Sequence, residues 1–453
     1  MTPSFWLDQL TLGSHRAPLN GTHDADVCIV GGGFTGVWLA YELRRADPSL
    51  RVVVLEAETA GFGASGRNGG WVQGEVSGSV EAWRKRGGRD AAVAMARAIR
   101  ATLPAMGDAI ERETIDCDWH HGGSLTVAQS ELQLARLHEE VDHERAWAGA
   151  DAALQLLSGA ELQARVAVDR GVGALFTPHC ARVQPAKLVT GVAQAAERAG
   201  AVIYEGTRVL NLKPGVARAA GGQVRARNVI LATEAYTVNL PGRRRMVLPM
   251  NSSMIVTEPL PEALWHELRW DGAETMLDGS YLYTYSQRTA DGRIAIGGRG
   301  VPYRFGSRTD REDPVPAQTV RQLRDRLRSL FPALGEVPVA RAWHGVLGVS
   351  RDWCPTVGLN RTTGIGFAGG YAGEGVAAAH LAAHTMCDLI LGRDTELARL
   401  PWVGAPPRNW EPEPLRFIGA RAVFHLYGEA DRREERTGRT TKLAAVANLI
   451  AGR

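Results

Sequence analysis

The sequence predicts an α/β fold in which a Rossmann-like domain, assembled from discontinuous segments, is combined with an α+β domain built on an antiparallel sheet. The apolar run at 27–30 leads into a glycine-rich turn, a helical pattern and a second apolar strand at 52–55, which is the order of a parallel βαβ unit. Alternating apolar patterns separated by short turns occupy 246–300 and are typical of antiparallel sheet. Loop, strand and helix patterns return after residue 340, so the second domain interrupts the first.

The glycine-rich turn has the spacing of a dinucleotide-binding motif. Gly31, Gly33 and Gly36 form G-x-G-x-x-G, and Glu56 follows Gly36 by 20 residues at the end of the next strand. The first glycine allows the tight turn, the second lets backbone approach a pyrophosphate, and the third lets helix and strand pack closely. The free N–H groups of the helix start face the anion, and the acid accepts from a ribose hydroxyl. We therefore predict an adenine dinucleotide site, in preference to an ordinary glycine-rich loop.

Length and composition restrict the class of protein. The 453 residues predict two or three domains, and 45% hydrophobic with 22% charged residues is typical of a soluble globular protein. A net charge of +3 argues against a nucleic-acid partner, and we interpret the basic cluster at 243–245 as a solvated turn. No run approaches the roughly 20 apolar residues that span a bilayer, and the N-terminus lacks a signal-peptide pattern. No membrane partner is expected, and the oligomeric state is left open.

The cysteines and histidines are read as structural. The five cysteines are scattered without a C-x-x-C pair, which predicts a reducing compartment and a cytoplasmic location. His380 and His384 have the i, i+4 spacing that metal ligands use on a helix, but only Leu-Ala-Ala lies between them, with no glutamate base. Helix packing is the interpretation we favour, and no metal is expected.

The pattern along the chain predicts the order of domains. An arm at 1–25 comes first; the dinucleotide domain is assembled from 26–80, 176–245 and 336–400; the second domain is assembled from 81–175 and 246–335; and 401–453 form a capping helix with a frayed tail. Helices are expected at 79–113, 129–153, 185–199 and 317–330, and strands at 122–127, 201–204, 224–232, 254–256 and 281–285.

Four blocks, taken in order, resemble the D-amino-acid oxidase family of flavoenzymes over residues 25–400. They are the turn at 31–36 with its acid, the glycine-rich loop 61–70, the strand and turn at 229–236, and the glycine-rich segment 369–376 that leads into a helix. The branch that looks nearest holds glycine oxidase, monomeric sarcosine oxidase and, most of all, gamma-glutamylputrescine oxidase. The resemblance implies an enzyme that oxidises a C–N bond.

The resemblance also implies FAD as the cofactor. In the family the 61–70 loop wraps the flavin phosphates and ring edge, and a helix start near 375 can stabilise negative charge on reduced flavin. Some relatives attach flavin through a cysteine near the place of Gly345 and others through a histidine in the 61–70 loop; neither residue is present, so non-covalent FAD is expected. The residues expected to bind it are Gly31, Gly33, Phe34, Thr35, Gly36, Glu56, Ala57, Gly63, Ala64, Ser65, Arg67, Asn68, Gly69, Gly70, Trp71, Val209, Thr233, Gly370, Tyr371, Gly373, Gly375 and Val376.

Departures from the family pattern bear on the substrate. Amino-acid-oxidising members hold the substrate carboxylate with an arginine in Trp-x-Gly-x-Arg-Pro, where this chain has Leu347, and this loss counts against a simple α-amino acid. The lysine thought to assist oxygen in sarcosine oxidases falls at Ala295, which puts fast reaction with oxygen in doubt. Glu234 replaces the asparagine of Thr-Asn-Ala-Tyr, and Glu374 stands in the last glycine block. Two acids in one pocket would favour a cationic amine.

Candidate substrate residues follow from the antiparallel region. Tyr281, Tyr283 and Tyr285 alternate, so they are expected on one face of a strand, as an aromatic wall for an amine or as a core ladder. His344, Tyr283 and Glu374 are the catalytic candidates. For His344 a structural role is the alternative, and for Glu374 a helix-dipole role. Arg299 would meet an anionic substrate group or pair on the surface.

The expected reaction is FAD-dependent oxidation of a small primary or secondary amine. A hydride moves to the flavin, the imine is hydrolysed, and O2 reoxidises the flavin to give H2O2. Burial lowers the pKa of the amine and exposes its lone pair. The alternatives are a dehydrogenase of the same fold with another electron acceptor, an aminophosphonate or amino-acid oxidase, a flavin monooxygenase, and a flavin-holding scaffold without catalysis.

Overall fold

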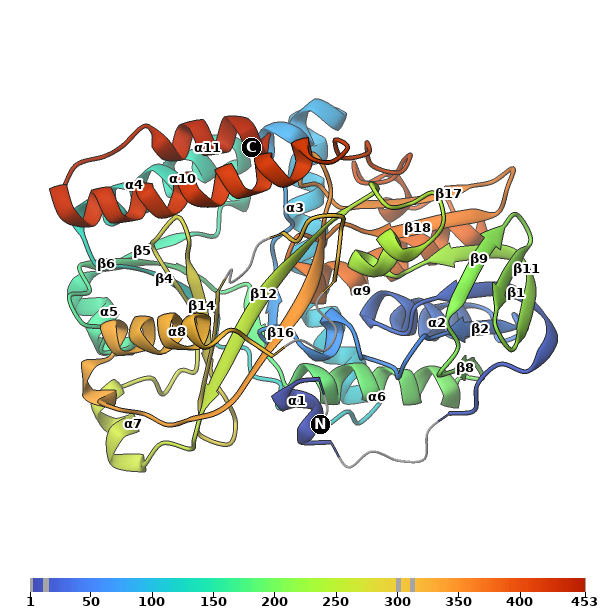
Figure 1. The fold of residues 1–453 in the computed structure, drawn as a ribbon, viewed down its shortest axis with the longest axis horizontal. Helices are drawn as coiled ribbons and strands as arrows, with labels where there is room; N and C mark the ends of the chain where they lie inside the picture. Colours follow the sequence, from blue (N-terminus) through green and yellow to red (C-terminus); the bar gives the residue numbers. More distant parts are fainter. Residues whose placement is uncertain (1–2, 11–15, 299–302, 310–313, 453) are drawn as a thin grey trace.

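The computed structural model describes residues 3–10, 16–298, 303–309 and 314–452. Within these ranges the strands form two eight-stranded sheets and one two-stranded sheet. Figure 1 shows the two large sheets in separate lobes, with the long strands β12 and β16 running between them. No helix in the described ranges is long and apolar enough to cross a membrane.

The first sheet is a mostly parallel, Rossmann-like sheet. Its order is β17-β18-β11-β1-β2-β8, and a hairpin of β9 and β10 extends β11. Strands β1, β2, β8, β11 and β18 pair in parallel, whereas β17 is antiparallel to β18. The strands are β1 (Gly21–Val30), β2 (Val52–Leu55), β8 (Val202–Tyr204), β9 (Val209–Lys213), β10 (Val216–Ala219), β11 (Gly222–Leu231), β17 (Thr356–Asn360) and β18 (Ile365–Gly369).

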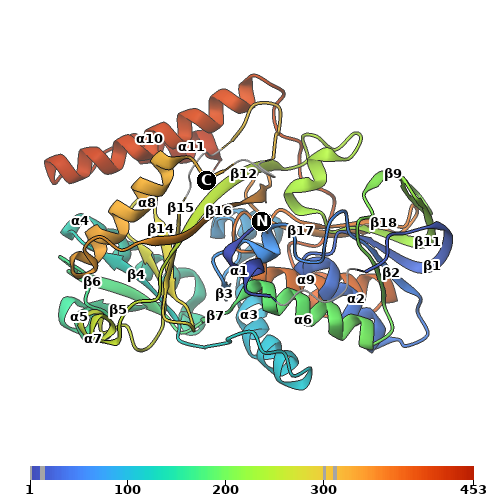
Figure 2. The same ribbon diagram turned by 60° about the horizontal axis from the view of Figure 1, so that its bottom comes forward.

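Helices pack against this sheet through an apolar core. Many of its buried residues come from β1, β2 and the four helices α2 (Phe34–Ala46), α3 (Val80–Arg112), α6 (Pro185–Arg198) and α9 (Gly375–Leu391). Figure 2 shows α2, α6 and α9 together along one side of the sheet. Helix α9 is buried along most of its length, whereas α3 leaves helical geometry at Gly87 and Gly88.

The second sheet is mostly antiparallel. Its order is β16-β12-β15-β14-β13-β4-β6-β5, with β13 and β4 the parallel pair. Its strands are β4 (Ser124–Ala128), β5 (Gln155–Ser158), β6 (Gly173–Thr177), β12 (Leu248–Thr257), β13 (Thr275–Asp278), β14 (Thr284–Arg288), β15 (Ile294–Gly298) and β16 (Val339–Val349). The helices of this lobe are α4 (Glu131–Ala148), α5 (Gly159–Arg165), α7 (Glu262–Leu268) and α8 (Ala317–Leu330).

The strands place part of the chain differently from the expected domain order. Strand β16 pairs with β12 along the edge of the second sheet, although 336–400 was expected in the dinucleotide domain. Strand β6 also belongs to the second sheet and runs past the expected boundary at 176. A short sheet of β3 (Trp71–Gln73) and β7 (Cys180–Arg182) joins the regions, and the segment after β16 returns to the first sheet.

The C-terminal segment is an ordered helical hairpin, so the expected frayed tail is wrong. Helices α10 (Leu415–Thr437) and α11 (Leu443–Ala451) pack on each other and lie across the second lobe (Figure 1). The alternating charges of 428–442 led to the prediction of a frayed tail, but some of these charged side chains bind other parts of the protein. Asp431 accepts from the backbone N–H groups of Tyr281 and Leu282, at 2.8 and 2.9 Å.

The N-terminal segment, expected as an arm before the first strand, packs against the rest of the protein. Helix α1 (Phe5–Asp8) packs against β16 through stacking of Phe5 on Trp343, whose centroids are 6.2 Å apart. Ser4 Oγ donates to the carbonyl of Gly66 at 2.6 Å, and Trp6 Nε1 donates to that of Asn68 at 2.8 Å. This segment therefore supports the loop at 61–70.

Candidate active site

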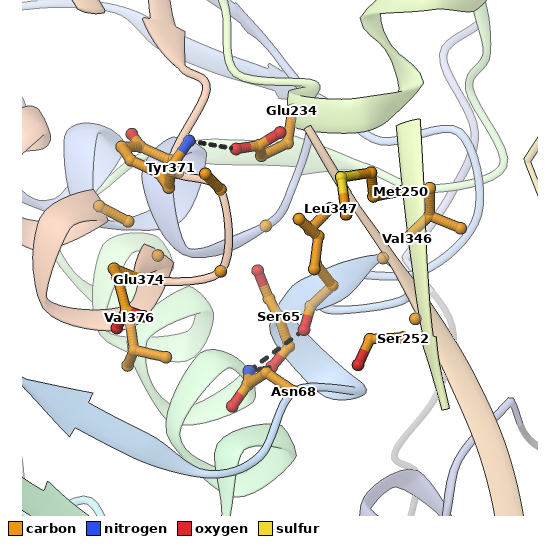
Figure 3. A pocket seen from close by; sticks show the side chains of 18 of the residues that line it. Ser65, Asn68, Glu234, Met250, Ser252, Val346, Leu347, Tyr371, Glu374 and Val376 are labelled. Atoms are coloured by element: carbon orange, nitrogen blue, oxygen red, sulfur yellow. Dashed lines mark hydrogen bonds between the residues drawn. The ribbon is translucent and has the colours of Figure 1, made fainter. Parts of the chain in front are cut away.

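A cavity of about 940 Å³ lies where the two lobes meet and is lined by residues of both. Its walls combine the glycine-rich turn after β1, the loop at 61–78, the ends of β12 and β16, the segment 371–376 and one face of α4. Figure 3 shows part of it, with Tyr371, Glu374 and Val376 on one side and Met250, Ser252 and Val346 on the other. Carboxyl ends of parallel strands are where such folds bind ligands.

The turn between β1 and α2 has the close packing that the motif predicts. Gly31 has φ +111°, and a Cβ on Gly36 would collide with the carbonyl oxygen of Gly31. A Cβ on Gly33 would lie 2.9 Å from Ser65 Oγ, and this hydroxyl accepts from the N–H of Phe34 at 2.8 Å. The backbone here is open to a ligand, and the start of α2 faces the cavity.

Glu56 is held at the end of β2 beside this turn. Its carboxylate accepts from the N–H of Gly32 at 2.7 Å and from that of Glu58 at 2.9 Å. Burial raises the pKa of Glu56, and the two backbone N–H groups act against that rise. A carboxylate offers about four acceptor positions, so two remain for a ribose in the cavity.

The 61–70 loop is stiffened by its own side chains. Asn68 Nδ2 donates to the carbonyl of Ser65 at 2.9 Å, and Asn68 Oδ1 accepts from the N–H of Gly70 at 2.7 Å (Figure 3 draws the first of these). Arg67 is 2% exposed, lies over the Phe62 ring at 4.4 Å and donates from Nε to the carbonyl of Phe62 at 2.7 Å. A buried guanidinium and a fixed backbone are thus presented to the cavity.

Glu234 supports the glycine-rich segment that precedes α9. It accepts from the N–H groups of Gly370 at 3.1 Å and Tyr371 at 2.8 Å (Figure 3). Burial raises the pKa of Glu234 to about 7, with these backbone N–H groups opposing the rise. Glu234 therefore orients the loop, while the Tyr371 hydroxyl hydrogen-bonds Thr35 at 2.9 Å. Glu234 and Glu374, the two acids considered for one pocket, both line this cavity.

The wall formed by β12 and β16 is apolar at Leu347, the position where relatives that oxidise amino acids have an arginine. Leu347 lies opposite Met250 in the strand register, and both line the cavity. Beside them Ser252 Oγ and Tyr285 Oη hydrogen-bond at 2.8 Å. Asn251 also lines the cavity, is 2% exposed, and has no hydrogen-bond partner for either amide atom among the described residues. A buried amide of this kind calls for a ligand or water.

The far part of the cavity is acidic. Glu75 and Glu140 line it and keep accessible surface there. Burial raises the pKa of Glu140 to about 7, and the charges of Glu75 and Glu144 add to the rise. Burial also raises the pKa of Glu75. Arg136, on the same helix as Glu140, is engaged by Glu434 at 2.6 Å. A cation entering here would relieve the repulsion between the two acids.

Most residues expected to bind the cofactor line this one cavity. Those that do are Gly31, Gly33, Phe34, Thr35, Glu56, Ala57, Gly63, Ala64, Ser65, Arg67, Asn68, Gly69, Trp71, Val209, Thr233, Tyr371, Gly373, Gly375 and Val376. Gly36, Gly70 and Gly370 lie behind it in the packed turns, where added Cβ atoms would meet backbone or side chains. Tyr281, Tyr283, Tyr285 and Glu374 also line the cavity.

The remaining candidate residues do not all line the cavity. His344 is not among the lining residues, and its catalytic role stays a prediction. The three tyrosines do not share a strand, because β14 begins at Thr284. Asp278 accepts from the Thr284 backbone and hydroxyl and from the N–H of Ser280, which holds 279–283 as a turn. Arg299 lies outside the described residues.

Several cavity residues were missed by sequence reasoning. Glu75, Glu140, Arg136 and Asn251 come from segments that carry no motif, and α4 shows little amphipathic pattern. Of these residues only Glu75 lies near a recognised motif, five residues after the 61–70 loop, so its position was the one signal in the sequence. Pocket residues on an unpatterned helix become visible once the fold brings that helix to the cavity.

The observed cradle fits FAD. Backbone without Cβ atoms faces the cavity at the turn after β1, a helix start supplies N–H groups, and Glu56 stands ready for a ribose. The Trp71 indole N–H and the Asn251 amide have no partner among the described residues and would face the bound group. These features define a dinucleotide-binding oxidoreductase with a flavin site between two lobes.

The chain belongs to the DAO family of FAD-dependent oxidoreductases, whose sequence profile matches residues 26–389. It is 34% identical over 410 residues to gamma-glutamylputrescine oxidoreductase of Escherichia coli (strain K12), covering 89% of this chain and 92% of the relative. Glycine oxidase of Geobacillus kaustophilus is 27% identical, over 84% and 97% of the two chains. The crystal structure of a glycine oxidase from that organism superposes with a TM-score of 0.72 at 24% identity, covering 86% and 100%. The protein is an FAD enzyme of this family.

Proposed function

We propose that the enzyme oxidises the C–N bond of a small primary or secondary amine that carries no free α-carboxylate beside the reacting carbon. One observation carries the proposal: the wall of the cavity includes the two acids Glu75 and Glu140, and the charge of Glu75 repels that of Glu140. The neighbouring arginine is neutralised by Glu434. Together with Leu347 at the place of a carboxylate-binding arginine, this supports a cationic rather than an anionic substrate.

The residues of this chain would bind and orient the amine. Bound FAD supplies the hydride acceptor. Tyr283 and Tyr285 line the cavity and would supply aromatic rings near a cation, and Leu347 with Met250 would exclude water from the reacting carbon. Burial of the reacting amine lowers its pKa and leaves the lone pair free. Glu374, at the start of α9, is the candidate for holding the amine or its proton, and Tyr283 for positioning it.

The relatives support the same class of substrate. The relatives include a gamma-glutamylputrescine oxidoreductase and a glycine oxidase, and a structure of an iminodiacetate oxidase from Chelativorans sp. BNC1 shares the fold with a TM-score of 0.67. All three names contain a nitrogen compound. The first fits the apolar and acidic walls best, because its amine is remote from the carboxylate of the glutamyl group.

We further propose that O2 reoxidises the flavin, giving H2O2, and that the enzyme works in the cytoplasm. The latter is supported by the five cysteines, each of which is free and buried. A dehydrogenase that delivers electrons to another acceptor is the second candidate. It is favoured by Ala295, which is fully buried in β15 at the place of the family's oxygen-assisting lysine.

Anaerobic reduction of the bound flavin tests the substrate class. Monoamines, diamines, acylated diamines, α-amino acids and aminophosphonates would be mixed with the oxidised holoprotein, and loss of flavin absorbance would be followed. Rapid bleaching by diamines or acylated diamines, with slower bleaching by glycine, is expected. Bleaching by α-amino acids alone would contradict the proposal. Admission of air to the reduced enzyme, with H2O2 measured, separates oxidase from dehydrogenase.

A further inference from the structure

Helices α2 and α9 bring together three side chains with metal-binding chemistry, none of which is among the residues that line the cavity. They are Glu42 of α2 and His380 and His384 of α9, and one ligand atom from each lies within 4.8 Å of the others. The sequence showed only the two histidines, four residues apart. The fold adds the carboxylate, which comes from a helix more than 330 residues earlier in the chain.

Two of the three side chains are buried and the third is partly exposed. His380 is 2% exposed and Glu42 8%, while the His384 side chain is 36% exposed. The Nδ1 atom of His380 is buried and has no hydrogen-bond partner among the described residues. An imidazole nitrogen left unpartnered inside a protein is costly, and a metal ion would satisfy it.

The geometry is close to that of a zinc site. His384 Nε2 and Glu42 Oε1 are 3.7 Å apart, and tetrahedral Zn²⁺ with bonds of 2.0–2.2 Å separates its ligand atoms by about 3.4 Å. The His380 and His384 rings lie 4.6 Å apart, and the Trp38 ring meets His380 edge-on at 4.6 Å, which fixes the His380 plane. Closing the widest separation requires a side-chain movement of about 1.4 Å at most.

We propose that Glu42, His380 and His384 form a Zn²⁺ site that joins α2 to α9. Two imidazoles and one carboxylate are ligands of Zn²⁺ and related transition ions, whereas Mg²⁺ and Ca²⁺ prefer oxygen. The exposed edge of His384 provides the entry path and leaves room for water as the fourth ligand.

Such a site would act on the cofactor cradle without touching it. Helix α2 begins at the dinucleotide turn and α9 begins at the segment that lines the flavin end of the cavity. A metal joining the two helices about one to three turns from those starts would hold them at a fixed separation. Its role would therefore be structural, and its removal is expected to lower stability before it changes chemistry.

Calorimetric titration of untagged holoprotein with ZnCl2 tests the proposal. The wild-type chain is expected to bind one equivalent with micromolar or tighter affinity, and both His384→Gln and Glu42→Gln are expected to weaken that binding at least tenfold. His425→Gln, which changes an exposed histidine on α10, is the matched control and should bind as the wild type does. Equal flavin content in all four proteins shows that the fold is retained.

Thermal unfolding provides a second readout that is independent of activity. Zn²⁺ should raise the Tm of the wild type and of His425→Gln but not that of His384→Gln, and Mg²⁺ should raise none of them. The proposal is overturned if Zn²⁺ binds His384→Gln and the wild type equally, or if no one-to-one site is detected. In that case Glu42 and His384 form an ion pair only, alongside Arg45, whose Nη1 is 3.9 Å from Glu42 Oε1.

Discussion

Replacement of Glu234 by glutamine should change how stability depends on pH. The carboxyl of Glu234 is enclosed beneath the 370–373 segment and accepts from the N–H groups of Gly370 and Tyr371. Burial raises its pKa from 4.5 to about 7. Glutamine keeps the shape and an acceptor oxygen but stays neutral at every pH, so it imitates the protonated acid.

The magnitude follows from that pKa. Between pH 4.5 and about 7 the folded protein retains a proton that the unfolded chain has released, so the free energy of unfolding falls as pH rises. The loss is complete above about pH 7 and amounts to roughly 3 kcal/mol, at 1.36 kcal/mol per pKa unit. In Glu234→Gln this loss is absent. In a chain of this length a change of 1 kcal/mol in unfolding free energy shifts Tm by roughly 1–2 °C, so the difference between the two proteins is roughly 3–6 °C.

Thermal unfolding of the two holoproteins from pH 4.5 to 8 measures the effect. The Tm of Glu234→Gln minus that of the wild type should increase by roughly 3–6 °C across this range, with most of the change between pH 5 and 7. Glu267→Gln, at an exposed site on α7, controls for the general loss of one carboxylate. If the curves of Glu234→Gln and the wild type run parallel, Glu234 titrates as an ordinary acid and the reasoning is refuted.

Three further variants address the cradle, the acidic part of the cavity and the C-terminal hairpin. Gly36→Ala should lose at least about tenfold in FAD affinity, because its Cβ collides with the turn, and flavin-to-protein absorbance measures this. Glu140→Gln should raise KM for a diamine by about tenfold, which corresponds to about 1.4 kcal/mol, while KM for a monoamine of the same length stays unchanged. Arg136→Met should destabilise the protein by about 3 kcal/mol, because Glu434 is left buried without its partner, and its Tm should fall.

Matched controls separate these effects from general damage. Gly404→Ala adds a methyl group where no atom lies within 4 Å, and it should keep full flavin content. Glu139→Gln alters the exposed neighbour on α4 and should leave both KM values unchanged. Arg433→Met removes an exposed charge from α10 and should leave Tm within about 1 °C. Equal losses in a variant and its control would contradict the role assigned to Gly36, Glu140 or Arg136.

Features encoded locally could be predicted from the sequence. The dinucleotide turn, its acid and the helix at 317–330 depend on spacing within a few dozen residues, and α8 (Ala317–Leu330) has the expected bounds. Glycines in such a motif are predictive because each stands at a fixed spacing where a side chain would not fit. The family block around 61–70 was also recognised, and most of its residues line the cavity.

Features that depend on distant contacts could not be predicted. Glu75 and Glu140 face one cavity only because the fold brings α4 to the loop after β3. Alternation predicted Tyr281 on one strand face with the two later tyrosines, but hydrogen bonds to Asp278 hold the residues after it in a turn. No sequence pattern records which residues of β16 line the cavity, and these are Gly345, Val346 and Leu347 but not His344.

The alternation of the chain between two sheets has a consequence for how the protein can be divided. Segments from near residue 31, 67, 234, 346 and 372 meet at one cavity, and the hairpin of α10 and α11 supports the second lobe through Tyr281. No single cut would release a half that contains a whole cradle. A nascent chain must therefore leave the ribosome almost complete before it can hold flavin, and recombination between relatives is expected to succeed only when matching pieces are exchanged together.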